Sequence, residues 1–351
     1  MAERFVLVLA GGRGERFWPW SRPARPKQLL PLAPGGRTLL AATLERARRV
    51  VPAEHILVLT ARDLVDVTRR ECPGVEVTGE PVGRNTAAAI GVAAMAFAAR
   101  AADPAFAVMP ADHVIEDAGT FAADLERAFA LAERERVLVT FGIPPREADP
   151  NFGYIRSGER LADRVHRVAR FTEKPDRERA RQWLAEGGYA WNSGIFVWRS
   201  AVFLDALRAS RPELARGLAP LADVRGEGLE AALDRIYPGI ESISVDYAVL
   251  ESAPNTLVIE AAFDWDDVGS WAAWARRQPH DERGNVVFGA GAVALDCERC
   301  VVVAEGGTAA AMGLSDMVVV HVDGATLTCR LDASEQVRRV TEAVRAKGGA
   351  T

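Results

Sequence analysis

The sequence predicts an α/β protein with a doubly wound, mostly parallel mixed sheet, followed by a small C-terminal β-rich domain. Apolar runs such as 4–10 and 105–109 are continuous rather than alternating, which is typical of strands buried on both faces of a sheet. Helical patterns separate these runs, as right-handed βαβ crossovers require. After Pro279 the sequence changes to short β-prone pieces separated by Gly and Asp.

The elements of the first domain can be taken in order. Residues 4–10 (RFVLVLA) are an apolar run that ends in glycines, as expected for a buried strand. Residues 38–50 place apolar side chains on one helical face, and Thr38 is suited to cap that helix. Further strands are expected at 55–60, 75–78, 105–109 and 136–142, and further helices at 62–71, 86–100 and 119–134.

Residues beyond 150 extend the same domain with a more mixed pattern. Strands are expected at 152–157, 165–172 and 194–199, and helices at 176–186, 200–209 and 228–236. The domain boundary is expected at 278–281, which divides the chain into residues 1–279 and 280–351. The second domain is predicted to hold β pieces over 285–329 and a helix at 333–346.

Composition excludes several classes of protein. The 351 residues include 43 Lys plus Arg and 48 Asp plus Glu, so a net charge of −5 gives no electrostatic case for binding nucleic acid or an anionic membrane. The first apolar run is too short for a signal peptide, and no low-polarity stretch could cross a bilayer. Four cysteines do not make a disulfide framework. We therefore expect a soluble cytoplasmic protein.

Lysine is unusually rare. Of the 43 basic residues, only Lys27, Lys174 and Lys347 are lysines. Because arginine is so strongly preferred in this chain, each lysine is an exception that needs a reason. Lysine offers a compact point charge that the planar guanidinium of arginine does not reproduce. Lys347 lies in the C-terminal tail, where a solvated lysine needs no explanation. Lys27 and Lys174 are therefore candidate functional residues.

A glycine-rich loop follows the first strand. Segment 11–16 (GGRGER) offers free backbone N–H groups that suit an anion, and Arg13, Arg16 and the nearby Lys27 suit phosphate oxygens. A dinucleotide-binding fingerprint would need Gly where Phe17 stands, and no P-loop motif occurs in the chain. The alternative is an ordinary glycine turn with surface arginines.

Acidic and amide side chains follow other strands. Asp112 comes after the strand at 105–109, and an acidic cluster at 264–269 (DWDDVG) follows an apolar run. Two carboxylates from different strand ends, with phosphates supplying further oxygens, suit Mg²⁺. Glu173, Lys174 and Asn192 are the residue types that hold sugar hydroxyls and a phosphate. The alternatives are loop-capping aspartates and a surface Glu–Lys pair.

Taken together, nine segments resemble the bacterial mannose-1-phosphate guanylyltransferase family, whose members have the nucleotide-diphospho-sugar transferase fold. The segments occur in family order at 9–19, 26–28, 80–87, 110–113, 152–155, 173–175, 191–196, 244–248 and 265–271. Each segment is weakly specific alone, and the ordered set is highly specific.

The resemblance implies a role for each group of residues. The GTP phosphates are bound by Gly11, Gly12, Gly14, Arg13 and Arg16 of the glycine-rich loop and by Lys27. Mg²⁺ or another divalent cation is held by Asp112 and Asp267, which with Arg13, Arg16 and Lys27 form the expected catalytic set. Guanine is read by Glu80, Asn85 and Thr86, and mannose 1-phosphate is bound by Gly153, Glu173, Lys174 and Asn192. Asp246 receives no role.

The activity implied by the resemblance is transfer of GMP from GTP to mannose 1-phosphate, with GDP-mannose and pyrophosphate as products. The expected mechanism is a metal-assisted, in-line attack of the sugar phosphate on the α-phosphorus. One alternative is the same reaction on another hexose 1-phosphate or nucleotide. Another is a regulatory paralogue that binds GDP-mannose without making it. The family also implies a homodimer.

Overall fold

The computed structural model describes residues 2–12, 14–222, 224 and 228–349, so Arg13 lies outside the described residues. The chain forms two compact units. The first comprises Met1–Gly11, Thr43–Ala111 and Ile115–Trp265, and the second comprises Gly12–Ala42, Asp112–Val114 and Asp266–Thr351. The second unit therefore combines the C-terminal β-rich segment with the glycine-rich loop. The predicted domain division after residue 279 stays a prediction.

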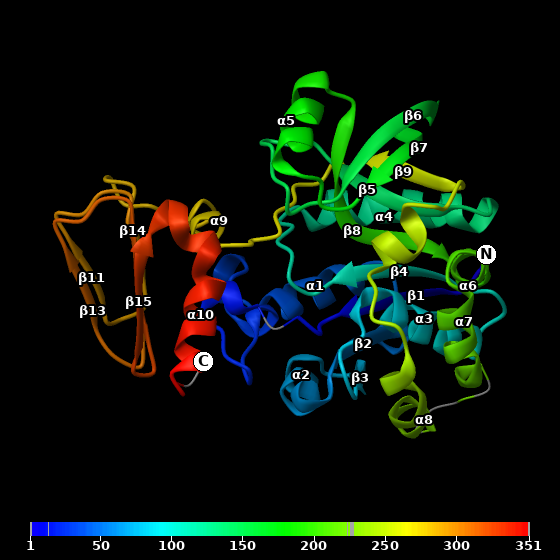
Figure 1. The fold of residues 1–351 in the computed structure, drawn as a ribbon, viewed down its shortest axis with the longest axis horizontal. Coiled ribbons are helices and arrows are strands. Elements are labelled where there is room, and N and C mark those ends of the chain that lie inside the picture. Colours follow the sequence, from blue (N-terminus) through cyan, green and yellow to red (C-terminus); the bar gives the residue numbers. More distant parts are fainter. Residues whose placement is uncertain (1, 13, 223, 225–227, 350–351) are drawn as a thin grey trace. The chain divides into compact units, whose positions relative to one another are not determined.

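The first unit is built on a nine-stranded sheet in the order β3-β2-β1-β4-β8-β5-β9-β7-β6 (Figure 1). Its strands are β1 Arg4–Leu9, β2 Ile56–Ala61, β3 Glu76–Glu80, β4 Ala105–Pro110, β5 Leu138–Ile143, β6 Tyr154–Ala162, β7 Val165–Thr172, β8 Tyr189–Arg199 and β9 Thr256–Glu260. Strands β3, β2, β1 and β4 pair in parallel, as do β5 and β9. The antiparallel pairs are β4–β8, β5–β8, β6–β7, β6–β8 and β7–β9. The sheet is therefore mixed, and parallel pairing is concentrated around β1.

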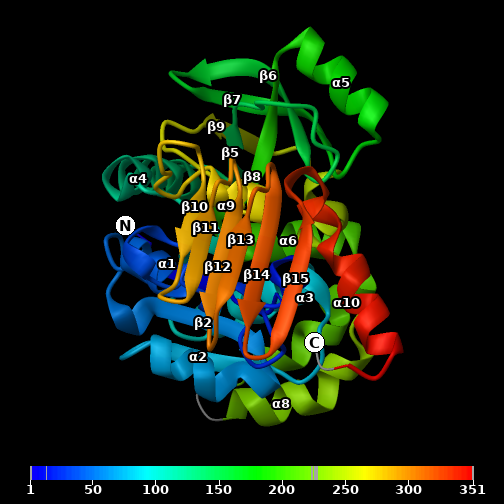
Figure 2. The ribbon, with the colours of Figure 1, turned by 90° about the vertical axis from the view of Figure 1, so that its left-hand side faces the viewer.

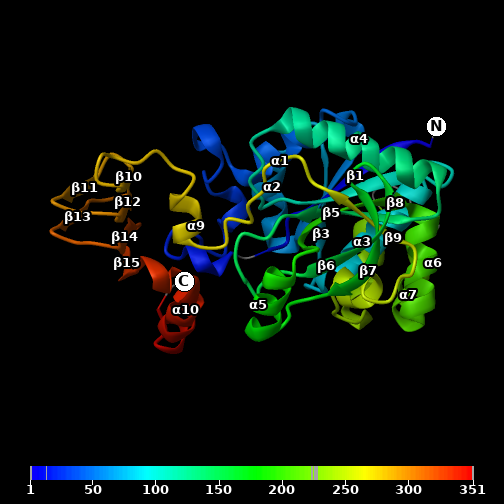
Figure 3. The same cartoon turned by 90° about the horizontal axis from the view of Figure 1, so that it is seen from above.

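Helices cover both faces of this sheet, which confirms the predicted α/β class (Figure 3). They are α1 Leu39–Ala47, α2 Val65–Glu71, α3 Asn85–Ala98, α4 Ala118–Arg134, α5 Arg177–Glu186, α6 Ser200–Ser210, α7 Pro212–Leu218 and α8 Gly228–Ile236. Helix α3 is apolar nearly all round and is buried between β1 and helices α6 and α7. Helix α4 lies against β4, β5 and β8 and is capped by Asp117, whose carboxylate accepts from the N–H groups of Gly119 and Thr120.

Strand β8 differs from the prediction in a way that matters for the site. It begins at Tyr189 rather than at 194, so Asn192 lies inside a strand. The sequence Asn192-Ser193-Gly194 has the composition of a turn, and Gly194 does have a positive φ of 71°. Pairing of β8 with β5 and β6 overrides this local preference.

Among its described residues, the second unit has six short strands in two sheets (Figure 2). They are β10 Val286–Phe288, β11 Ala292–Leu295, β12 Val301–Glu305, β13 Ala309–Met312, β14 Met317–Val322 and β15 Ala325–Arg330. Alternate strands pair in parallel, β10 with β12, β12 with β14, and β11 with β13, so the chain winds as a coil with one sheet on each side. Cys297 and Cys300 are buried inside this coil as free thiols.

Two helices complete the second unit, α9 Trp271–Ala275 and α10 Val337–Ala346. Trp271 and Trp274 of α9 are fully buried, and the Trp271 ring stacks 5.8 Å from the ring of Trp20. Phe17 packs against the same Trp271 ring at 5.1 Å. This aromatic core fixes the segment that follows the glycine-rich loop, because aromatic pairs at these distances add to the free energy of burial.

Candidate active site

The glycine-rich loop packs closely against Lys27. Gly14 has a φ of 61°, and a Cβ atom at this position would lie 2.7 Å from the backbone nitrogen of Lys27. Both the backbone conformation and the close approach therefore require glycine. A short 3₁₀ helix at Glu15–Phe17 follows, and Lys27 begins a second one at Lys27–Leu29. Arg16 and Lys27 thus lie in two short 3₁₀ helices, one at the end of the glycine-rich loop and one further along the chain.

Lys27 joins two predicted site residues. Its side chain is 8% exposed, and its Nζ donates to Asp112 Oδ2 at 2.9 Å. The same ammonium donates to the backbone carbonyl of Asp267 at 2.5 Å. Lys27, Asp112 and Asp267 therefore lie together, and the roles expected of them stay predictions.

A small antiparallel bridge explains why the two aspartates are neighbours. Val114 and Asp266 exchange backbone hydrogen bonds of 2.9 and 3.0 Å, which aligns residues 112–114 with residues 266–268. Arg16 completes the cluster: a Cβ on Gly269 would lie 2.8 Å from Asp267 Oδ2 and 3.1 Å from Arg16 Nη1. Gly269 thus leaves room for a guanidinium and a carboxylate to meet.

The charges of this cluster influence one another. Burial raises the pKa of Asp112, but the Lys27 ammonium and His113 outweigh it and lower that pKa to about 2. Burial raises the pKa of Asp267, and the carboxylates of Asp266 and Asp112 raise it further. The positive charges of Lys27 and Arg16 lower this pKa, but the net shift is upward. A cation between the two carboxylates would relieve the repulsion between Asp112 and Asp267.

The donor set fits a divalent cation of the magnesium type. Asp112 is 40% exposed, so its carboxylate is accessible to a ligand. Mg²⁺ binds through one or two carboxylates plus substrate phosphates and waters. Within the described ranges, no group of three or more His, Cys, Asp or Glu side chains could hold a metal ion on its own. The two aspartates therefore suit a cation that arrives with a polyphosphate.

Residues predicted to read guanine lie in the first unit with Gly11. The Glu80 carboxylate ends β3, accepts a hydrogen bond from the Tyr237 hydroxyl, and lies 3.3 Å from the Cβ position of Gly11. Burial raises the pKa of Glu80, although the hydrogen bond from Tyr237 lowers it. Thr86 Oγ1 accepts from the backbone N–H of Val245 at 2.9 Å.

The four residues predicted to bind the sugar phosphate also come together in the first unit. A Cβ on Gly153 would lie 2.5 Å from Glu173 Oε2 and 3.4 Å from Asn192 Cβ, so a side chain there would displace the Glu173 carboxylate. The Asn192 backbone N–H donates to the Gly153 carbonyl at 2.8 Å. Lys174 Nζ donates to Glu173 Oε1 at 2.5 Å, and the Glu173 side chain is only 8% exposed. That this group and the Lys27 cluster face one pocket stays a prediction.

Asp246 is a member of the sugar-side group that the sequence left without a role. Its Oδ1 accepts from Asn192 Nδ2 at 3.0 Å, while Asn192 Oδ1 accepts from the Thr140 hydroxyl at 3.0 Å. The orientation of the Asn192 amide is therefore fixed from both ends. The sequence signal was the acidic residue in segment 244–248, but nothing in the sequence showed its partner.

Asp246 should make stability pH-dependent. Burial and the Glu173 carboxylate raise its pKa from 3.8 to about 7. The Asp246 carboxyl loses its proton at a lower pH in the unfolded state than in the folded state. Its contribution to the free energy of unfolding is therefore full below about pH 4 and is lost as the pH rises to about 7. We expect Asp246→Asn, which cannot ionise, to gain melting temperature relative to the wild type across that range. Calorimetry between pH 4 and 8 measures the two melting temperatures. If their difference does not change with pH, this prediction is wrong.

Comparisons with known proteins cover most of the chain. The family model for nucleotidyl transferases matches residues 5–284, and that for the MannoseP isomerase/GMP-like beta-helix domain matches residues 291–344. The mannose-1-phosphate guanylyltransferase of Klebsiella pneumoniae is 36% identical over 96% of this chain and 73% of its own length. The enzyme of the same name from Escherichia coli is 35% identical over the same shares of both chains.

A solved structure agrees with these relatives. The crystal structure of a protein from Thermus thermophilus, described as mannose-1-phosphate geranyltransferase, superposes with a TM-score of 0.87. It is 38% identical, and the match covers 98% of this chain and 99% of that one. The similarity therefore includes the C-terminal β-rich segment as well as the larger sheet.

Proposed function

This chain belongs to the nucleotidyl transferase family, and we infer that it is a mannose-1-phosphate guanylyltransferase. It transfers GMP from GTP to mannose 1-phosphate and so forms GDP-mannose and pyrophosphate. Similarity over the full chain supports the substrates. The single structural observation that supports the chemistry is the buried Lys27 ammonium, which bridges Asp112 and the Asp267 backbone.

The reaction needs charge neutralisation more than it needs a base. A phosphomonoester with a second pKa of about 6 is largely a dianion at neutral pH, so the sugar phosphate is already a nucleophile. Its approach to a polyanionic nucleotide is opposed by repulsion. We propose that Lys27 and Arg16, with Arg13, neutralise the triphosphate and hold the α-phosphorus in line with the attacking oxygen.

We propose that Asp112 and Asp267 are the protein ligands of Mg²⁺ or another divalent cation. When bound, such a cation neutralises phosphate charge and orients the leaving pyrophosphate. Lys27 keeps Asp112 ionised at neutral pH, since it holds the pKa of that carboxyl low. The carboxylate is therefore ready to bind a cation without losing a proton.

On the sugar side, we propose that Gly153, Glu173, Lys174 and Asn192 bind mannose 1-phosphate. The Lys174 ammonium is 59% exposed and suits the phosphate, while the buried Glu173 carboxylate suits sugar hydroxyls. Gly153 leaves the space that the Glu173 carboxylate needs. The Asn192 amide, fixed by Thr140 and Asp246, retains one N–H for a hydroxyl oxygen.

We propose that Glu80, with Asn85 and Thr86, reads guanine. Guanine offers N–H donors to a carboxylate where adenine offers an acceptor, so adenine leaves the Glu80 carboxylate without the hydrogen bonds that guanine would donate. Glu80→Gln is expected to lower kcat/KM for GTP by about tenfold to a hundredfold and to change the ATP reaction little. Nucleotide kinetics at saturating mannose 1-phosphate measure this ratio. Glu76→Gln, at the exposed start of β3, is the control.

A direct assay tests the proposed function. We expect metal-dependent pyrophosphate release from GTP with mannose 1-phosphate, and much slower release when glucose 1-phosphate or ATP replaces either substrate. Equal rates with glucose 1-phosphate or ATP would favour a different nucleotidyltransferase. Tight binding of GDP-mannose without any pyrophosphate release would favour a regulatory paralogue.

We also propose that the enzyme acts in the cytoplasm, without nucleic acid or a membrane. The four cysteines are free thiols, which is typical of a reducing compartment. Among the described residues, no helix has the length and apolar character needed to cross a bilayer. We keep the division into a nucleotidyltransferase domain (1–279) and a β-rich domain (280–351) as a proposal, and the matches of the two family models support it.

We propose that the homodimer forms through an apolar stripe on β11 and β13. Val293, Leu295 and Met312 are 41%, 55% and 71% exposed, and the register pairs Leu295 with Met312. An exposed apolar patch on paired strands is typical of an interface. Met312→Glu is expected to give monomers in sedimentation velocity, whereas Leu184→Glu on α5 should leave the dimer intact. An unchanged sedimentation coefficient for Met312→Glu would contradict this interface.

A further inference from the structure

The C-terminal β-rich segment holds the chain between the glycine-rich loop and Lys27. Glu305, the last residue of β12, accepts hydrogen bonds from two side chains of this stretch. Trp20 Nε1 donates to Glu305 Oε2 at 2.6 Å, and Arg25 Nη1 donates to Glu305 Oε1 at 2.5 Å. Each carboxylate oxygen thus has its own partner.

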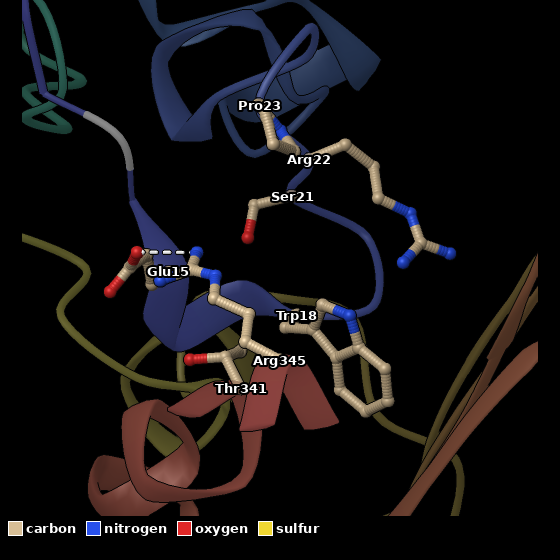
Figure 4. A pocket seen from close by; sticks show the side chains of 7 residues that line it. All are labelled: Glu15, Trp18, Ser21, Arg22, Pro23, Thr341 and Arg345. Atoms are coloured by element: carbon tan, nitrogen blue, oxygen red, sulfur yellow. Dashed lines mark hydrogen bonds and ion pairs between the residues drawn. The ribbon is translucent and has the colours of Figure 1, made fainter. Parts of the chain in front are cut away.

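A second anchor comes from α10. Arg345 Nη2 donates to Glu15 Oε1 at 2.7 Å (Figure 4). Arg338 Nε lies 3.5 Å from Glu15 Oε2. Beside this ion pair is a small pocket, which Glu15 and Arg345 line together with side chains that include Trp18 and Ser21. The ion pair therefore joins the segment that follows the glycine-rich loop to α10.

The anchored stretch is the one that supplies the cations of the site. Glu15 lies between Gly14, which contacts Lys27, and Arg16, which lies beside Asp267. Arg25 lies two residues before Lys27. A shift of either anchor would therefore move Arg16 or Lys27 relative to Asp112 and Asp267.

We propose that the C-terminal β-rich segment positions the loop that binds the GTP phosphates, with Glu305 and Arg345 as positioning residues. This gives the segment a role in catalysis although neither residue touches substrate. The inference rests on the proposed function, because it assumes that the loop binds GTP. It differs from a purely structural role in one respect: the effect falls on GTP and spares mannose 1-phosphate.

Two variants and two matched controls test the proposal. Arg345→Ala removes the shorter of the two α10 contacts with Glu15 and leaves the longer one of Arg338. Arg339→Ala on the same helix removes an arginine whose Nη1 donates to the nearby Gln336. Glu305→Gln weakens the β12 anchor, and Glu298→Gln changes an exposed glutamate in the same segment. Arg345→Lys retains the charge and should restore much of the loss.

The expected result is a KM for GTP raised about two- to fivefold by Arg345→Ala, as for a partly exposed ion pair. Glu305→Gln, which weakens two charge-assisted hydrogen bonds, should raise it about tenfold. The KM for mannose 1-phosphate should stay within about twofold in all variants. Calorimetric titration with GTP alone should show the same order of affinities, and the melting temperatures report folding separately.

Several outcomes would overturn the proposal. They are an unchanged KM for GTP in both variants, equal rises of both KM values, and an equal effect in the control variants. Failure of the wild type to release pyrophosphate from GTP would instead count against the proposed function. GTP titration still tests the anchors in that case, and Arg345→Ala, at a side chain 47% exposed, removes no buried group.

Discussion

Lys27→Ala is expected to lower kcat/KM for GTP by about a hundredfold to a thousandfold, as the loss of one buried, preorganised charge does in other enzymes. The ammonium is 8% exposed and is held by Asp112 and by the Asp267 carbonyl, so it needs little reorganisation when a phosphate arrives. Pyrophosphate release under subsaturating GTP measures the loss. Melting temperature shows whether the variant remains folded.

Two further variants separate a specific role for Lys27 from a general effect of charge. Lys347→Ala removes a lysine from the exposed tail and should leave the rate unchanged. Lys27→Arg retains the charge but needs space for a planar group, where the backbone of Lys27 already packs against Gly14. We expect it to recover little activity. Near-normal turnover of Lys27→Ala or Lys27→Arg would show that the rare lysine is not needed as a point charge.

The parts of the site that the sequence predicted are those set by strand ends and by composition. Asp112 follows β4, and Lys27 stood out because lysine is so rare in this chain. Gly14 and Gly153 were placed by the family resemblance, and the structure shows the physical reason for both, which is close approach of another side chain or backbone. Fold class was predictable because apolar runs and helical periodicity are local signals.

The parts that could not be predicted depend on contacts between distant segments. Asp246 binds Asn192 across 54 positions, and Glu305 binds Trp20 across 285. No local pattern marks such partners. The predicted start of β8 at residue 194 was wrong, because the strand begins at Tyr189. Asn192 and Gly194 have turn-like propensities, which pairing within the sheet overrides. Tertiary contacts, rather than local propensity, decide these cases.

Asp112→Asn and Asp267→Asn are each expected to lower kcat/KM by about a thousandfold, because a cation that neutralises phosphate charge contributes several kcal/mol to the barrier. Both changes preserve side-chain size and remove a negative charge. If the two carboxylates share a cation, both variants should also require more Mn²⁺ for half-maximal activity. Direct titration with Mn²⁺, followed by paramagnetic resonance in the presence of GTP, measures this without turnover.

Asp264→Asn is the matched control, because the Asp264 carboxylate lies three residues before Asp267 and accepts from the backbone N–H groups of Glu116 and Asp117. Its amide oxygen can still accept, so activity and Mn²⁺ dependence should stay near those of the wild type. The competing explanation for Asp112 is that it only orients Lys27. In that case Asp112→Asn would lower the rate with an unchanged Mn²⁺ requirement, and combining it with Lys27→Ala would add almost nothing. A shifted Mn²⁺ requirement in both Asp112→Asn and Asp267→Asn is the result that a shared cation demands.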